Sequence, residues 1–238
     1  MQNKIEVIFE NEDFLIINKP SGLLVHPVVK ADPQEPALTD WLLANYPQLE
    51  TVGDEPQLRP GIVHRLDKET SGVLVVAKNQ KTFEELKNLF QTRQIEKTYL
   101  ALVIGQPAQN HGIIDLPIAK ASKSTKRTSH VKPNQKSSAA ITVWSVKKVY
   151  STPEQILSLL KVKPRTGRTH QIRVHLAAIN HPVVGDYLYG GKATQQYRSA
   201  LKRTFLHAHS LKFKLGQTNF YFEAELPAEL QAFLDQLG

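Results

Sequence analysis

Cysteine is absent from this 238-residue chain, which excludes a disulfide framework and any metal site built on thiolates. No apolar run approaches the roughly 20 residues that a membrane-spanning helix needs. Acidic residues interrupt the first stretch, residues 1–13, where a secretory signal peptide needs an apolar core. We therefore expect a soluble protein of the reducing cytoplasm.

Acidic residues are also missing from residues 116–150, although the whole chain has 22 of them against 30 lysines and arginines. The net charge of +8 and the isoelectric point near 9.5 suit a polyanionic partner, nucleic acid before membrane. Much of 120–138 is Ser, Thr and Lys without a hydrophobic period, which predicts a mobile basic loop or hairpin. It is either a solvated linker or an arm that contacts phosphates. The basic residues of the whole stretch 116–150 are Lys120, Lys123, Lys126, Arg127, Lys132, Lys136, Lys147 and Lys148.

A polar cluster, residues 64–70, runs directly into the valine-rich run 73–77, which is typical of a buried strand. Loops at the end of a core strand often carry chemistry. Asp67 lies between Arg65 and Lys68, and opposite charges keep a carboxylate ionised by lowering its pKa. An ionised Asp67 can act as a nucleophile or a base. A solvated ion pair or a turn cap would explain the same residues.

A second basic cluster, residues 163–176, precedes and enters a predicted helix. Thr169 is the expected N-cap, and Arg165 and Arg168 come just before it. A helix N-terminus flanked by guanidinium groups is a natural anion site. Arg173 lies near the first turn. A basic amphipathic helix without a ligand would also fit this pattern.

Strands joined mostly by hairpins dominate the predicted elements. This pattern predicts an α+β fold, with a mixed, mainly antiparallel sheet flanked by helices. No Pro/Gly/Ser-rich linker divides the chain, so we expect residues 1–238 to form a single domain. The expected strands are 5–9, 14–18, 73–77, 95–105, 140–149, 156–162, 205–214 and 219–224, and the expected helices are 37–46, 80–92, 169–180 and 227–237.

Long strings of residues carry a family resemblance. Residues 64–78 read HRLDKETSGVLVVAK, residues 97–105 match K-x-Y-L-A-x-V-x-G, and residues 166–175 read TGRTHQIRVH. Together with KPSGLLVHP at 19–27, they resemble the RluA-type family of RNA pseudouridine synthases. Residues 117–128 resemble the large-subunit ribosomal RNA members, but residues 135–140 depart from the family pattern.

The resemblance implies the pseudouridine synthase catalytic fold and roles for individual residues. Asp67 is implied as the catalytic residue, Tyr99 as the residue that stacks on the target base, and Arg173 as the partner of Asp67, with Arg168 as second choice. The implied reaction needs no cofactor and no metal. The implied RNA-binding and base-flipping residues are Arg65, His64, Arg165, Arg168, Lys126 and Arg127.

The resemblance also bears on partners. The expected partner is ribosomal RNA, with transfer RNA as the other candidate, and the expected oligomeric state is a monomer. Because the chain begins at the predicted first hairpin, no RNA-binding domain of the S4 type is expected. Two other functions fit part of the sequence: a non-catalytic RNA-binding protein on the same fold, and a nucleosidase or glycoside hydrolase, which usually needs two carboxylates.

Overall fold

The structure is a computed structural model that describes residues 5–27, 35–121 and 126–238. The chain divides into two compact units. The first comprises the chain up to residue 96 together with 208–225, and the second comprises 97–207 and 226–238. Each unit is described by itself below. The prediction of a single catalytic domain stays a prediction.

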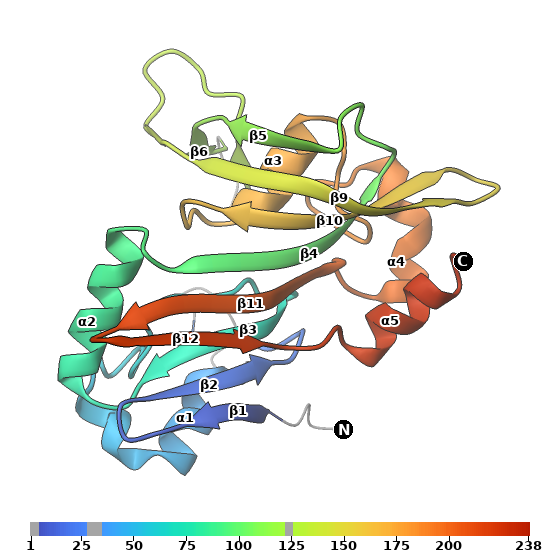
Figure 1. Ribbon diagram of the computed structural model, residues 1–238. Coiled ribbons are helices and arrows are strands. Elements are labelled where there is room, and N and C mark those ends of the chain that lie inside the picture. The colour runs from blue at the N-terminus through green and yellow to red at the C-terminus, as the bar shows by residue number, and fades with distance from the viewer. Residues whose placement is uncertain (1–4, 28–34, 122–125) are drawn as a thin grey trace. The chain divides into compact units, whose positions relative to one another are not determined.

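The first unit is built on a sheet whose strand order is β1-β2-β3-β11, with β12 paired to β11. The pairs β1–β2, β2–β3 and β11–β12 are antiparallel (Figure 1). All of β3 and nearly all of β2 are buried, which explains their continuous apolar sequences. The strand bounds are β1 Glu6–Glu10, β2 Phe14–Lys19, β3 Ser71–Ala77, β11 Leu206–Leu215 and β12 Thr218–Glu223.

A cluster of phenylalanine rings, some of them only half-buried, packs on the sheet of this first unit. Phe14 packs edge-on against Phe213 and Phe220, with ring centroids 5.7 and 5.1 Å apart. Phe9 and Phe222 pack against each other at 5.1 Å. These contacts join the first hairpin of the chain to its last hairpin.

Three helical segments complete the first unit: α1 Leu38–Asn45, the 3-10 helix η1 Pro47–Thr51, and α2 Gln80–Gln91. The side chain of Asn79 caps α2 by accepting a hydrogen bond from the Thr82 amide at 2.9 Å. Phe83 and Leu86 form the buried side of α2, which packs on β3. The helix predicted over residues 80–92 is therefore confirmed.

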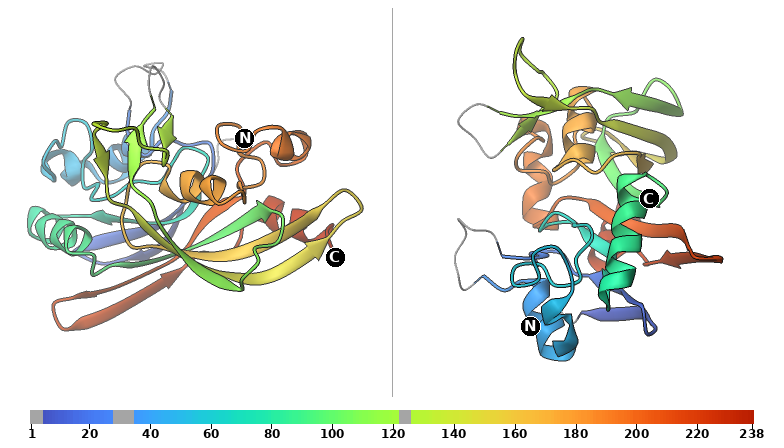
Figure 2. Two further views of the ribbon diagram at one scale, coloured as in Figure 1. Left: turned by 90° about the horizontal axis from the view of Figure 1, so that it is seen from above. Right: turned by 90° about the vertical axis from the view of Figure 1, so that its left-hand side faces the viewer.

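The second unit contains the antiparallel sheet β4-β10-β9-β5 (Figure 1). Helix α3 packs on β9 and β10 (Figure 2). Three very short strands form a separate small sheet in the order β7-β6-β8. The strands are β4 Glu96–Ile104, β5 His111–Asp115, β6 Ile118–Lys120, β7 Arg127–Thr128, β8 Ser137–Ser138, β9 Ile141–Ser151 and β10 Ile156–Pro164. The helices are α3 Gln171–Ala178, η2 Lys192–Thr194, α4 Gln195–Leu201 and α5 Ala228–Asp235.

The predicted α+β class and its hairpins are confirmed, and two details differ. The predicted N-cap at Thr169 is wrong, because α3 begins at Gln171 and its N-cap is His170, with φ at 57°. The Gln171 side chain holds the preceding turn in place of a threonine cap: its Oε1 accepts from the Arg168 amide at 3.0 Å and from the Thr166 hydroxyl at 2.7 Å. Strand β5 and helix α4 were not among the predicted elements.

The basic segment 120–138 had two predicted forms, a mobile loop or a hairpin. Where it is described, it contributes β7 and β8, which pair antiparallel with β6. The hairpin form is therefore the better description. Lys123 lies outside the described residues. Within the described ranges no helix is long and apolar enough to cross a membrane.

Candidate active site

Asp67 lies in a tight turn just before β3. Its backbone carbonyl accepts a hydrogen bond from the Thr70 amide at 3.0 Å. Leu66 and Thr70 on either side are buried, while Asp67 itself is half-buried. Gly72 follows with φ at 117°, and a Cβ there would lie 2.1 Å from the Ala208 carbonyl oxygen. A glycine is therefore required where the turn becomes a strand.

Residues 19–23 brace this turn. The Ser21 hydroxyl donates to the Glu69 carbonyl at 2.8 Å, and the Gly22 amide donates to the Lys68 carbonyl at 2.9 Å. Lys19 is completely buried, and its ammonium also donates to the Lys68 carbonyl, at 3.2 Å. Lys19 belongs to the KPSGLLVHP motif of the resemblance, but no role was predicted for it.

His64 accepts a hydrogen bond from the main chain of β3. Its Nε2 accepts a hydrogen bond from the Val75 amide at 3.1 Å, so Nδ1 carries the proton of the neutral ring. The ring stacks on Phe90 of α2 with centroids 4.4 Å apart. These contacts fix the loop that leads to Asp67.

Arg65 is exposed and extends to a histidine of the first motif. Its Nη1 donates to Nε2 of His26 at 2.9 Å, and His26 Nδ1 lies 2.9 Å from the Pro27 carbonyl oxygen. His26 is therefore neutral, with its proton on Nδ1. Burial, with the Arg65 charge adding to it, lowers the pKa of His26 and favours this form. His26 belongs to the KPSGLLVHP motif, but the sequence predicted no contact for it.

Tyr99 belongs to the second unit, where it lies in β4 opposite Val162 of β10 and is half-buried. Lys97 lies two residues earlier on the same face of the strand. Burial lowers the pKa of Lys97 to about 8. The Lys97 ammonium lies 3.5 Å from the Thr166 carbonyl oxygen, beside the turn before α3. An amine of lowered pKa therefore accompanies the predicted stacking residue.

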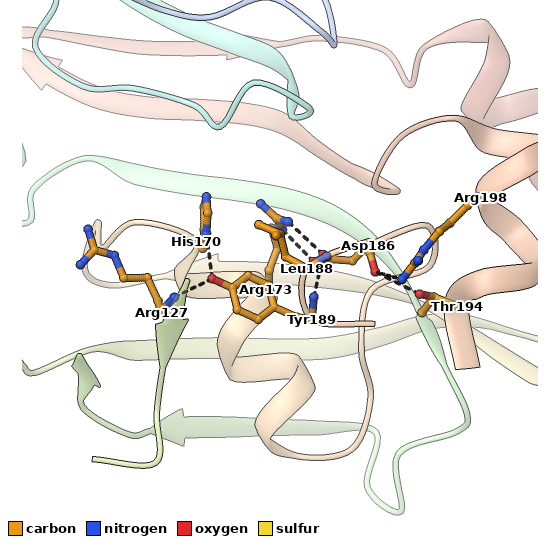
Figure 3. A network of polar contacts seen from close by, with 8 residues as sticks. All are labelled: Arg127, His170, Arg173, Asp186, Leu188, Tyr189, Thr194 and Arg198. Atoms are coloured by element: carbon orange, nitrogen blue, oxygen red, sulfur yellow. Dashed lines mark hydrogen bonds and ion pairs between the residues drawn. The ribbon is translucent and has the colours of Figure 1, made fainter. Parts of the chain in front are cut away.

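Arg173 lies buried in α3 and binds Asp186 of the same unit. Its Nε lies 2.7 Å from Oδ2 of Asp186, and its Nη2 lies 2.9 Å from Oδ1 (Figure 3). Asp186 is fully buried and also accepts hydrogen bonds from the amides of Leu188 and Tyr189. This carboxylate therefore fixes the orientation of Arg173. The sequence did not predict this pair.

Tyr189 also contacts the guanidinium of Arg173. The guanidinium carbon is 5.2 Å from the centroid of the Tyr189 ring, which is within cation–π range. The Tyr189 hydroxyl lies 2.8 Å from His170 Nδ1 and accepts a hydrogen bond from the Arg127 amide at 2.9 Å (Figure 3). One tyrosine therefore contacts β7, the N-cap of α3 and Arg173.

The remaining basic candidates lie on the surface of the second unit. Arg165, Arg168 and Lys126 are exposed. The Arg168 guanidinium is held by the Ala139 carbonyl at 3.3 Å. Among the described residues no group of three or more His, Cys, Asp or Glu side chains has an arrangement that could hold a metal ion.

The structure thus brings the predicted residues together in two groups. Asp67, Arg65 and His64 share one loop of the first unit. Arg173 and Arg127 share the contacts of Tyr189 in the second unit. That unit also contains Tyr99, Arg165, Arg168 and Lys126.

Comparison with known proteins adds an independent finding. The family described as RNA pseudouridylate synthase matches residues 13–178. An uncharacterised RNA pseudouridine synthase of Aquifex aeolicus is 45% identical over 190 residues, which is 80% of this chain and 57% of that protein. The ribosomal large subunit pseudouridine synthase D of Borreliella burgdorferi is 35% identical over 97% of this chain and 68% of its own length.

Solved structures agree with the sequence relatives. The human RNA pseudouridylate synthase domain containing 1 protein has a TM-score of 0.76 and 26% identity, with 94% of this chain and 84% of that chain covered. The chain therefore spans nearly all of this structural relative, but less than two thirds of the Aquifex relative.

Proposed function

Because this chain belongs to the RNA pseudouridylate synthase family, we propose that it isomerises specific uridines in structured RNA to pseudouridine. One observation carries the proposal: Asp67 stands in a turn that residues 19–23 hold at the start of a fully buried strand. Ribosomal RNA is the favoured substrate, because the Borreliella relative is named for the large ribosomal subunit. Transfer RNA is the second candidate.

The reaction breaks the bond between C1′ of the ribose and N1 of the uracil, turns the base and joins C5 to C1′. C5 loses its proton and N1 gains one, so the isomerisation is redox-neutral and needs no cofactor. The Asp67 carboxylate acts either as a nucleophile at C1′ or as the base that removes the 2′ proton.

Arg173 orients the Asp67 carboxylate. Asp186 binds Nε and Nη2 of Arg173 and so fixes the direction of its guanidinium. Tyr99 stacks on the extruded uracil, and Arg65 fills the space that the base leaves. The neutral ring of His26 holds Arg65 by accepting a hydrogen bond from its Nη1.

The phosphates of the RNA are bound by the basic surface of the second unit. The binding residues are Arg165, Arg168, Lys126 and Arg127, and guanidinium groups suit phosphate by bidentate geometry. The chain acts as a monomer on RNA loops or single-stranded segments, whose bases are accessible. We place it in the cytoplasm.

Tritium release from RNA labelled at C5 of uridine tests the proposal, because C5 must lose its hydrogen when it joins the sugar. Asp67→Asn keeps the shape of the side chain but removes the charge. Glu69→Gln, two residues along the same turn, is the matched control. We expect release by the wild type and by Glu69→Gln, and a fall of at least about a thousandfold for Asp67→Asn.

Three results would contradict the proposal in different ways. No release by the wild type with unmodified ribosomal and transfer RNA would favour a non-catalytic RNA-binding protein. Release by Asp67→Asn would place the chemistry on another residue. Free uracil in the products would indicate a hydrolase.

A further inference from the structure

Tyr189 joins the three-stranded sheet β7-β6-β8 to helix α3. Its ring packs against a buried cluster formed by Ile118 of β6, Ala140, and Val174 of α3. Its hydroxyl accepts the Arg127 amide at 2.9 Å, so the main chain of β7 is tied to the same ring. β7 has two residues and pairs with β6 through Ala119 and Lys120. A strand this short needs further contacts to keep a fixed position.

The side chain of Arg127 indicates a function for the hydrogen bond between β7 and Tyr189. Its Nε is buried and has no hydrogen-bond partner within the described residues. A buried donor without a partner has a free-energy cost, which a ligand that accepts the hydrogen bond removes. A guanidinium with an unused donor suits a phosphodiester oxygen. The anchored amide of Arg127 fixes where this side chain begins.

The second contact of Tyr189 leads to the proposed catalytic centre. The centroid of its ring lies 5.2 Å from the guanidinium carbon of Arg173. The Nε and Nη2 of this guanidinium are bound to Asp186. The amide of Tyr189 itself donates to Asp186 at 3.0 Å. Movement of this tyrosine would therefore change both the attachment of β7 and the support of Arg173.

We propose that Tyr189 is a positioning residue with two separable functions: its hydroxyl presents Arg127 to a phosphodiester of the RNA backbone, and its ring supports Arg173. The inference rests on the proposed function, because it assigns the bound phosphate to the RNA substrate. Two substitutions separate the functions. Tyr189→Phe removes the hydroxyl and keeps the ring, whereas Tyr189→Leu removes both.

Salt-dependent RNA binding tests the function of the hydroxyl. The logarithm of the binding constant falls with the logarithm of salt concentration, by a slope of about 0.7 for each phosphate contact to a single strand. Arg127→Ala should lower this slope by about 0.7 and weaken binding. Tyr189→Phe should lower the slope by about the same amount and weaken binding by about three- to tenfold, because Arg127 is no longer fixed. Tyr187→Phe is the matched control: Tyr187 is 58% exposed and two residues away, and its variant should bind as the wild type does.

A double-substitution cycle distinguishes positioning from general damage to the fold. The variant with both Arg127→Ala and Tyr189→Phe should bind no more weakly than Arg127→Ala alone. Additive losses would overturn the proposal. So would a wild-type salt slope for either Tyr189→Phe or Arg127→Ala.

Turnover tests the function of the ring. Tritium release should show the loss for Tyr189→Phe mainly in KM, and an additional loss of at least tenfold in kcat for Tyr189→Leu. Equal kcat for these two variants would overturn the assignment of the ring to Arg173. Binding is measured without turnover, so a wild type that binds RNA but releases no tritium would refute the proposed function and still leave the binding cycle interpretable.

Discussion

Substitution of Lys19 by methionine should destabilise the protein strongly. The Lys19 ammonium donates hydrogen bonds to the carbonyl oxygens of Pro20, Leu23 and Lys68 at 2.7, 2.8 and 3.2 Å, and the residue is 0% exposed. Hydrogen bonds to a charged group contribute about 1.5–3 kcal/mol each, so their sum is roughly 5–9 kcal/mol. Burying the ammonium costs several kcal/mol. Since methionine avoids that cost but leaves carbonyls without their donor, we expect a net loss of about 3 kcal/mol in the free energy of unfolding.

Urea unfolding followed by circular dichroism measures this loss. An unchanged m-value would show that the substitution altered the stability and not the surface exposed on unfolding. Lys78→Met is the matched control. Lys78 donates to Glu10 and to the Asn11 carbonyl, both at 2.7 Å, but the Glu10 side chain is 41% exposed, so we expect a cost of about 1 kcal/mol. If Lys19→Met costs no more than Lys78→Met, the described role of the buried ammonium is wrong. Where the variant remains folded, tritium release should also fall, because the turn of Asp67 has lost a brace.

Two further predictions concern stability in the second unit. His175 is fully buried and its pKa is lowered by burial, so below about pH 6.5 the unfolded state takes up the proton first. The stability advantage of the wild type over His175→Gln, measured by urea midpoints, should therefore be complete above about pH 6.5 and shrink as the pH falls; an advantage that is constant from pH 8 to 5 would contradict this. Gly185→Ala should cost at least about 3 kcal/mol, because φ is 77° and a Cβ would lie 2.1 Å from the Arg203 carbonyl oxygen. In Gly191→Ala the new Cβ meets no described atom within 4 Å, so thermal melts should show only the backbone cost of about 1–3 kcal/mol for φ 56° and ψ −148°. A cost as large as that of Gly185→Ala or larger would refute the steric argument.

Local patterns explain why much of the fold was predictable. The strands of the first and last hairpins follow apolar runs, and turn residues such as Gly216 separate them. Helix α2 has both an Asn79 cap and an apolar side, so two independent signals agreed. Elements without such agreement were missed. Strand β5 has an exposed Ile113, at 69%, so burial does not impose an alternating pattern on it.

The site was predictable where one stretch of sequence contains both partners. The loop of Asp67 is continuous with β3 and could be read as a unit. The contacts of Arg65 with His26, and of Arg173 with Asp186, join residues distant in sequence. The N-cap at Thr169 was predicted from residue type alone, but the Gln171 side chain satisfies the turn instead. Tertiary neighbours decide such contacts, and no periodicity reports them.

The division of the chain between the two units has a consequence for biosynthesis. Residues 208–225 complete the first unit, and residues 226–238 complete the second. Phe14 packs against Phe213 and Phe220, which are therefore synthesised after all of residues 97–207 of the second unit. Neither unit can close its core during early translation, and contacts between such distant segments form slowly. The nascent chain should thus expose the outer surfaces of Phe9 and Phe14 until residues 208–225 have been synthesised.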